Sequence, residues 1–519
     1  MKKLKLLSCT LLLALVACGG ATTPSNNNPT SSDTPVSEEV SNPETPTSEE
    51  NPVSEEGPVS EEVSNPEDPT SEDKPAEDPF KDAYTPVEFD TTKDVTIKFY
   101  STMGQNLRKV YDIFIEDFNE MYPNITVEHT TGFGYDELLS QIKTELWVGE
   151  GPDIAYCYAD HVATYNKTKK VVKLDKIIAD ETYGLSAEQK ADFIEGYYNE
   201  GSQFGDGYMY TLPFSKSTEV LYYNKEFFAK HNLTVPTTWD EMEETCRQIK
   251  AIDPTSIPLG YDSEANLFIT MCEQLDSPYT SAAGVDGEHF LFDNDVNKAF
   301  TKRLKSWYDN GYLTTQEIYG SFTSGLFTET GEGNQKCYMC IGSSAGASHQ
   351  IPALDDSGAY PFTTGIAPIP QYNENNKKVI SQGPSLCLFS QKDPQKVMAS
   401  WLLMKFLTTD VGFQAQFSMD SGYVPVLKSV QEFDFYKNQH LANAEKGNGY
   451  ISALSSKVCL EQVDNYFTSD AFLGSSDARV NVGAMLQAIL TYSGTDLDAY
   501  IDQTFANTVY QCNYAIGNV

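Results

Sequence analysis

Apolar residues from position 94 onward recur with two alternating spacings. Val95, Ile97 and Phe99 are separated by single residues, which is the two-residue period of a strand. Between 107 and 121 the apolar residues return every three or four positions, the period of an amphipathic helix. The predicted elements are a strand over 94–100, a helix over 107–121, a strand over 125–128, a helix over 135–147 and a strand over 152–158. This order predicts a parallel α/β sheet, with ligands beyond the carboxyl ends of its strands.

A second series of elements begins near residue 212. Thr238 and Glu241 have the spacing of a capping box, in which the Thr side chain accepts the backbone N–H of the Glu and the Glu side chain accepts that of the Thr. The predicted elements are a strand over 220–223, helices from 224, 238 and 298, a strand over 337–342, an extended segment over 364–370 and a mostly helical tail from 410. Two such series in about 430 residues exceed what one core holds, so we expect two lobes.

The N-terminus has the order of a secretory signal. Lys2, Lys3 and Lys5 precede an apolar run over 6–16, which is shorter than the ~20 residues of a transmembrane helix. The four residues that end at Cys18 resemble the lipobox of bacterial lipoproteins, so we expect residues 1–18 to be a lipoprotein signal and Cys18 to carry lipid. The chain is therefore expected at the extracellular face of a cell membrane, held by its lipid anchor.

Residues 19–89 form a segment of different composition. Between Ala21 and Phe80 there are sixteen acidic residues and one lysine, Lys74, and the sequence Pro-Val-Ser-Glu-Glu occurs three times. Such a segment has almost no apolar surface to bury, so its ordering entropy is not offset. We interpret it as a disordered acidic tether; the alternative is a segment that binds the cell wall or acts as an adhesive.

Charge and cysteine content narrow the function further. The formal net charge is −38, from 74 acidic and 36 basic residues. This excludes general nucleic-acid binding, which needs Lys and Arg to neutralise phosphates, and disfavours lying on an anionic bilayer. Eight cysteines follow Cys18 without the spacing of a disulfide framework. Cys337 and Cys340 form a single CxxC, which we interpret as buried thiols of a strand and not as a metal site.

From about residue 94 to 519 the chain resembles the family 1 extracellular solute-binding proteins of ABC importers. The resemblance depends on five short motifs in family order and not on any one of them. They are Leu212-Pro213 with 221–228, Thr238-Trp239-Asp240-Glu241, Ala367-Pro368-Ile369-Pro370, 401–406, and Gly422-Tyr423-Val424-Pro425-Val426.

The resemblance implies a two-lobed α/β fold of the periplasmic-binding-protein type II class, with the ligand in the cleft between the lobes. We expect 90–213 and 363–409 in the first lobe, and 214–362 and 410–519 in the second. The implied partners are a small solute, which the closed form binds better than the open form, and the permease subunits of an ABC importer. A monomer is expected, with no cofactor, metal or nucleic acid.

One stretch is more specific about the ligand. Residues 213–225, with Ser217 among them, resemble the glycerol-3-phosphate-binding proteins of this family. The resemblance implies ligand-binding roles for Tyr135, Ser217, Ser343, Ser344, Gly383, Tyr423 and Arg479. This chain departs from the pattern at Ala159, where the relatives have a glycerol-binding Glu; Asp160, one residue later, is the expected substitute. The departure leaves a mono- or oligosaccharide as the competing ligand.

The chemistry of Arg479 also bears on the ligand, independently of the resemblance. The chain has four arginines, and Arg479 alone follows a loop-like run, 474–478. A guanidinium binds phosphate through two parallel hydrogen bonds, so Arg479 is a candidate anion site; the alternative is a surface pair with Asp477. For a sugar, Tyr135, Tyr158, Tyr222, Tyr223 and Tyr423 are candidate stacking platforms. The four Trp, Trp147, Trp239, Trp307 and Trp401, are expected in the core.

Two other function classes compete with a binding protein. A cell-surface carbohydrate-active enzyme would use paired carboxylates, but 74 acidic residues make chance pairs abundant. The chain has none of the GxSxG, P-loop or HExxH motifs. An adhesin would show repeated β-modules in the folded part, whereas the only repeats lie in the tether. We therefore expect no enzymatic activity.

Overall fold

A computed structural model describes residues 79–517 of the chain. The predicted lipoprotein signal, the lipid site at Cys18 and most of the predicted tether lie outside the described residues. Among residues 79–517, no helix has the length and apolar character needed to cross a membrane.

The folded part of the chain begins before residue 89, which is the predicted end of the tether. Ala83 and Phe89 are buried, and the Phe89 N–H donates to the Tyr183 hydroxyl at 2.9 Å. The ring of Phe80 meets that of Tyr208 edge to face, with 5.8 Å between centroids. The aromatic residues that end the acidic segment therefore pack against the first lobe.

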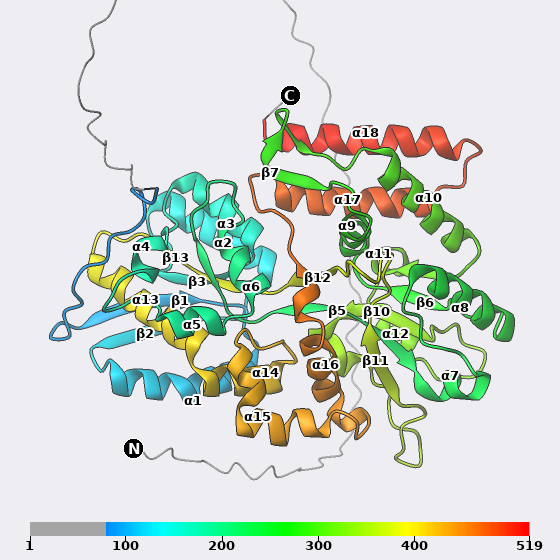
Figure 1. The fold of residues 1–519 in the computed structure, drawn as a ribbon, viewed down its shortest axis with the longest axis horizontal. Coiled ribbons are helices and arrows are strands. Elements are labelled where there is room, and N and C mark those ends of the chain that lie inside the picture. Colours follow the sequence, from blue (N-terminus) through cyan, green and yellow to red (C-terminus); the bar gives the residue numbers. More distant parts are fainter. Residues whose placement is uncertain (1–78, 518–519) are drawn as a thin grey trace, which may run out of the picture. The chain divides into compact units, whose positions relative to one another are not determined.

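The first lobe is built on a five-stranded sheet in the order β2-β1-β3-β13-β4 (Figure 1). Strand β1 (Val95–Tyr100) pairs in parallel with β2 (Ile125–Thr130) and β3 (Ile154–Cys157), as predicted. Strand β13 (Ser385–Leu388) runs antiparallel to both β3 and β4 (Thr211–Pro213). The helices are α1 (Gln105–Met121), α2 (Tyr135–Val148), α3 (Ala159–Tyr165), α4 (Asp175–Ile178), α5 (Ala187–Asp192), α6 (Glu195–Asn199), α13 (Pro394–Thr409), α14 (Val411–Ser421) and α15 (Asp434–Gln439).

The second lobe is built on a larger mixed sheet around β5 (Ser217–Asn224). The other strands are β6 (Leu259–Tyr261), β9 (Leu313–Thr315), β10 (Met339–Ser343), β11 (Thr364–Pro368), β12 (Val379–Gln382) and β14 (Tyr466–Phe467), with β7 (Thr280–Val285) and β8 (Glu288–Phe290) as a separate pair. The helices are α7 (Lys225–His231), α8 (Trp239–Ile252), α9 (Glu264–Gln274), α10 (Asp295–Asp309), α11 (Gln316–Tyr319), α12 (Ser324–Phe327), α16 (Ile451–Leu460), α17 (Ser475–Thr491) and α18 (Leu497–Ala515). Thr238 and Glu241 cap α8 as predicted.

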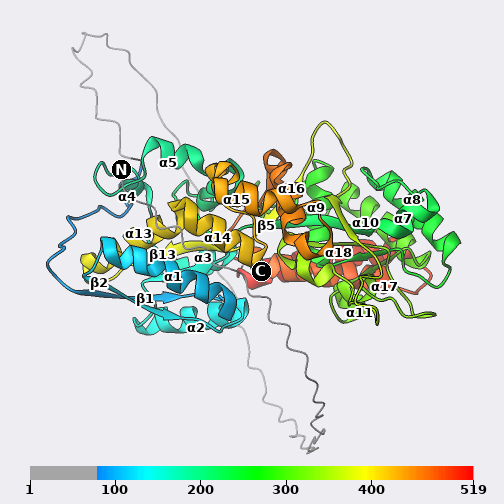
Figure 2. The same ribbon diagram turned by 90° about the horizontal axis from the view of Figure 1, so that it is seen from below.

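The distribution of elements differs from the expected lobe boundaries. Strands β11 and β12 were expected in the first lobe, yet both pair with β5 of the second sheet. Helix α14 was expected in the second lobe, yet it packs against α1 (Figure 2). The chain returns to the first sheet only after Gln382, because β12 extends alongside β5 before β13 begins.

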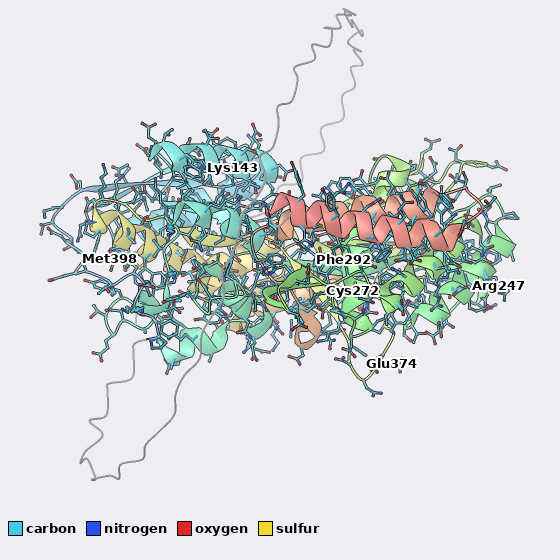
Figure 3. All side chains as sticks on the ribbon, turned by 90° about the horizontal axis from the view of Figure 1, so that it is seen from above. Lys143, Arg247, Cys272, Phe292, Glu374 and Met398 are labelled. Carbon is cyan, nitrogen blue, oxygen red and sulfur yellow. The ribbon has the colours of Figure 1, made fainter. Side chains whose placement is uncertain are left out.

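The core consists of two clusters of buried apolar side chains: one fills the first lobe and continues over part of the second sheet, through Tyr222 and Ile366, and the other lies within the second lobe. Met398 is fully buried in the first, and Cys272 and Phe292 in the second (Figure 3). Trp239, Trp307 and Trp401 are buried as expected, whereas Trp147, in the last turn of α2, is 68% exposed. All eight cysteines of residues 79–517 are unpaired and buried, Cys337 and Cys340 included.

Two strand-to-strand connections pass between the lobes side by side. The first joins β4 to β5 through residues 214–216, and the second joins β12 to β13 through Gly383 and Pro384. The N–H groups of Phe214 and Ser215 both donate to the Pro384 carbonyl, at 3.3 and 3.1 Å. The two connections thus form one ribbon that belongs to both sheets.

A buried histidine makes stability sensitive to acid. His440 lies where α15 meets α16, with Nε2 3.0 Å from the Ser456 hydroxyl, and burial lowers its pKa to about 4. The unfolded chain has a His pKa near 6.5, so between pH 6.5 and 4 protons bind on unfolding and the folded state loses stability.

We predict that His440→Gln, which keeps a hydrogen-bonding side chain, reduces the loss of unfolding free energy between pH 7 and 5 by about 1–2 kcal/mol. Urea unfolding at both pH values measures it. The control is His231→Gln at the end of α7, where the side chain is half-exposed and packs beside Phe227. Equal acid sensitivity of wild type and His440→Gln would contradict the prediction.

Candidate solute-binding cleft

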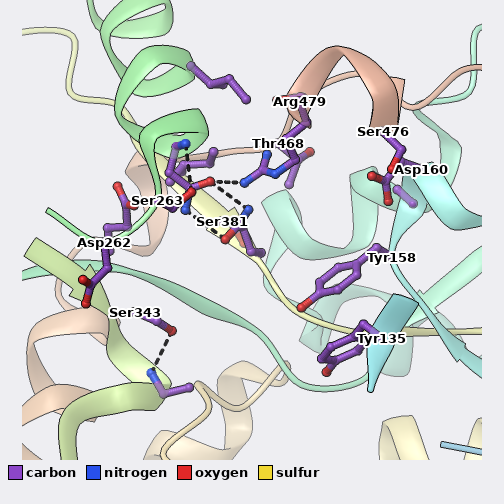
Figure 4. A pocket seen from close by; sticks show the side chains of 18 of the residues that line it. Tyr135, Tyr158, Asp160, Asp262, Ser263, Ser343, Ser381, Thr468, Ser476 and Arg479 are labelled. Atoms are coloured by element: carbon purple, nitrogen blue, oxygen red, sulfur yellow. Dashed lines mark hydrogen bonds between the residues drawn. The ribbon is translucent and has the colours of Figure 1, made fainter. Parts of the chain in front are cut away.

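A cavity of about 800 Å³ lies between the two lobes. Much of its wall comes from residues that follow strands. Tyr158 and Asp160 follow β3, Asp262 and Ser263 follow β6, and Ser343 ends β10. The N-terminal turns of α17 close the cavity from above in Figure 4. The cavity therefore lies beyond the carboxyl ends of these strands, and the end of β3 is one of the positions where the sequence predicts that ligands gather.

The first-lobe wall is aromatic. The rings of Tyr135 and Tyr158 lie 4.6 Å apart between centroids, and Tyr158 meets His161 edge to face at 5.3 Å (Figure 4). Burial, as the largest cause, raises the pKa of both phenols well above the usual value. At neutral pH this wall therefore presents uncharged rings with hydroxyl groups, which suits stacking against an apolar face of a solute.

The second-lobe wall is a hydrogen-bonded amide network. Asn266 of α9 exchanges two hydrogen bonds of 3.0 Å with Gln382, and its Oδ1 also accepts from Arg479 of α17. Arg479 is half-buried in the cavity wall and forms no ion pair with a carboxylate in residues 79–517, Asp477 included. The structure thus places Arg479 in the cleft and not in a surface pair.

Carboxylates outnumber cations around the cavity. The acidic lining residues are Asp136, Asp160, Glu200, Glu219, Asp262 and Asp470, and Arg479 is the one Lys or Arg among the lining residues of the described chain. Glu219 of β5 is 2% exposed, and Tyr261 donates to its Oε2. Burial raises the Glu219 pKa to about 7, against the hydrogen bonds of Tyr261 and Asn266 and the charge of Arg479. The cavity therefore has an excess of negative charge.

The structure brings together half of the residues expected to bind ligand. Tyr135, Asp160, Ser343 and Arg479 line the cavity. Asp160 lies in the first turn of α3, where its carboxylate accepts the His161 N–H at 2.9 Å. Glu219 and Asn266 were not anticipated; the only signal was one acidic residue immediately before the apolar run of β5.

The other expected residues lie outside this cavity. Tyr423 lines, with Tyr135, a smaller cavity of about 210 Å³ within the first lobe. Ser217, Ser344 and Gly383 line neither cavity. The Ser344 hydroxyl accepts the Thr218 N–H at 3.1 Å, and the Gly383 carbonyl accepts the Lys216 ammonium at 2.9 Å. These groups hold strands together behind the cavity wall. Tyr222 is fully buried in the core and Tyr223 also lies outside the lining.

Residues 114–444 match the family model of the bacterial extracellular solute-binding proteins. This chain belongs to that family. Relatives of this solute-binding protein include the sn-glycerol-3-phosphate-binding periplasmic protein UgpB of Escherichia coli K12, 24% identical over 429 residues, which are 78% of this chain and 90% of UgpB.

No group of three or more His, Cys, Asp or Glu within residues 79–517 is arranged to hold a metal ion.

Solved structures share the fold of this solute-binding protein. The cyclic alpha-maltosyl-1,6-maltose binding protein of Arthrobacter globiformis superimposes with a TM-score of 0.63 at 16% identity, over 82% of this chain and all of that one. UgpB of Mycobacterium tuberculosis, in complex with glycerophosphocholine, gives 0.62 at 17% identity, over 82% and 98% of the two chains. The expected two-lobed fold is confirmed by these neighbours.

We predict that Gly383→Ala destabilises the protein by about 2 kcal/mol, because its φ of 117° strains an L-residue and the new Cβ would lie 2.4 Å from the Ser215 carbonyl oxygen. Thermal unfolding measures it. Gly346→Ala is the matched control, since Gly346 lines the cavity and its Cβ would meet nothing within 4 Å. A fully stable Gly383→Ala would show that the two connections are not packed as described.

Proposed function

We propose that this chain is the substrate-binding subunit of an ABC importer and that it captures a neutral, polyhydroxylated solute of the carbohydrate class between its lobes. The observation that carries the proposal is the cavity of about 800 Å³ with one aromatic wall and one wall of amides and carboxylates. Rings such as Tyr158 stack on the apolar face of a sugar, and carboxylates and amides accept and donate to its hydroxyl groups.

Charge favours a neutral ligand. Six acidic side chains and one guanidinium line the cavity; the Glu200 carboxylate already pairs with Lys216 behind the wall, and Glu219, with its pKa raised to about 7, is only partly ionised at neutral pH. A phosphate dianion would be repelled by the remaining acids, and like charges in a site of low dielectric cost more than they do in water. Sugar hydroxyls carry no such penalty.

Closure of the cleft would be the conformational change that the permease recognises. A solute that touches both Tyr158 in the first lobe and Asn266 in the second stabilises the closed form, because only that form provides both sets of contacts. One chain supplies both walls, which supports a monomer. We also propose that the body is attached to the outer face of the membrane through lipid on Cys18 and the acidic segment that follows, without enzymatic activity.

Glycerol phosphate is the second candidate ligand. Arg479 favours it, because a half-buried guanidinium in the cavity can bind a phosphate through two hydrogen bonds once it leaves Asn266. The similarity to UgpB proteins, which covers 78% of this chain, gives the same candidate.

We predict that maltose or maltotriose raises the melting temperature and gives a calorimetric binding signal, whereas glycerol-3-phosphate and glycerophosphocholine do not. Arg479→Ala should leave binding of a neutral sugar nearly unchanged and abolish any binding of a phosphorylated ligand. Arg247→Ala, on the exposed face of α8 beside Glu244, is the control. Binding of the phosphorylated ligands alone would replace carbohydrate with glycerol phosphate as the ligand class.

We predict that Cys18→Ser releases the protein from the membrane fraction into the medium, because stable attachment requires the acyl chains that the cysteine would carry. Fractionation followed by immunoblotting measures it. Cys9→Ser is the matched control, since Cys9 lies within the signal and should leave the mature protein in the membrane fraction. Retention of Cys18→Ser in the membrane would contradict lipid attachment at this residue.

A further inference from the structure

The ribbon that joins the lobes has an irregularity in its backbone pairing. In the second sheet Ser217 pairs with Gln382, and in the first sheet Pro213 pairs with Ser385. Between these pairs three residues, 214–216, lie opposite two, Gly383 and Pro384, and the N–H groups of Phe214 and Ser215 share one acceptor, the Pro384 carbonyl. A ribbon bends most easily where its ladder of hydrogen bonds is irregular, so this mismatch is where one lobe can rotate relative to the other.

The side chain of Lys216 lies beside this mismatch. Lys216 is fully buried, and its ammonium donates to the Gly383 carbonyl and to the Ser385 hydroxyl, both at 2.9 Å. The same ammonium forms an ion pair with Glu200, and Ser385 donates to the Glu200 carboxylate at 3.0 Å. One lysine therefore adds side-chain bonds to the mismatched stretch and connects both strands of the ribbon to the first lobe.

The backbone of Lys216 is also held. Its carbonyl accepts the Val424 N–H at 2.7 Å, and its N–H donates to the Val424 carbonyl at 3.4 Å. Val424 lies in the segment that follows α14. Three segments far apart in the sequence thus meet at Lys216: the ribbon strand that carries it, the ribbon strand at Gly383, and the segment at Val424.

Glu200 connects this arrangement to the cavity, because it lines the cavity wall. We propose that Lys216, Glu200 and Ser385 form a pivot, a set of positioning residues that restrains bending at the ribbon and thereby sets the equilibrium between open and closed lobes. Charge-assisted hydrogen bonds to a buried ammonium suit this role, since they are strong and directional. The inference rests on the closure proposed above, and it concerns the hinge and not the choice of solute.

The test measures the distance between the lobes without ligand. Spin labels are placed on α2 and α8 through Lys143→Cys and Arg247→Cys, two exposed positions on different lobes (Figure 3). The protein is residues 18–519 with Cys18→Ser, and its eight other cysteines are buried, which keeps them from reacting. Pulsed electron resonance gives the distribution of interlobe distances.

We expect Ser385→Ala to broaden this distribution and Lys216→Met to broaden it at least twofold. Lys405→Met is the control, because Lys405 also donates to backbone carbonyls, those of Tyr183 and Gly184, but on α13, away from the ribbon. It should leave the distribution unchanged.

An unchanged distribution in a folded Lys216→Met protein would overturn the pivot. If that variant does not fold, an unchanged distribution in the Ser385→Ala protein would overturn the pivot instead. Equal broadening by Lys405→Met would also overturn it, because the effect would then reflect general destabilisation. Failure of every sugar to bind would refute the proposed ligand class while leaving the distance measurement valid, so the two failures can be distinguished.

Discussion

The structure depends on one constraint, which is that a single two-stranded ribbon belongs to both sheets. Its strands pair within the second sheet at Ser217 and Gln382 and within the first sheet at Pro213 and Ser385. The chain crosses between the lobes once more, between α15 and α16, so the walls of the cavity move relative to each other by bending the ribbon and this third crossing. The close approach of Gly383 to the Ser215 carbonyl leaves no room for a side chain at the bend.

The cleft combines features that favour a neutral solute with one that favours an anion. Tyr135 and Tyr158 supply uncharged rings, and the acids around them make the cavity negative. Arg479 donates a hydrogen bond to Asn266, and Asn266 is hydrogen-bonded to Gln382. The charge of Arg479 therefore lies within an amide network. Similarity to relatives suggests two ligand classes, and the rings and acids of the cavity favour the neutral one.

Much of the fold could be predicted from the sequence, because local patterns determine local elements. The alternation at Val95, the helical spacing after it and the cap at Thr238 each correspond to an element in the structure. The lobe to which β11 and β12 belong could not be predicted, because an extended apolar segment has the same sequence pattern whichever sheet it joins. Trp147 was misplaced because a helix pattern does not reveal how far the last turn of α2 projects beyond the core.

The site was predictable only in part for a similar reason. Tyr135, Asp160, Ser343 and Arg479 were found through resemblance to relatives, and they line the cavity. Ser217, Ser344 and Gly383 do not line it: Ser217 is the first residue of β5, Ser344 follows β10, and Gly383 lies in the connection between β12 and β13. Glu219 was missed, since a lone acid among 74 carries no signal until its burial is known.

The unpaired cysteines have a consequence for life outside the cell. Burial raises the pKa of thiols such as Cys272 and Cys340 well above the usual value, so almost no thiolate is present to react with peroxide or another disulfide. Within residues 79–517 these sulfurs are therefore poorly reactive whether the surroundings are anaerobic or aerated.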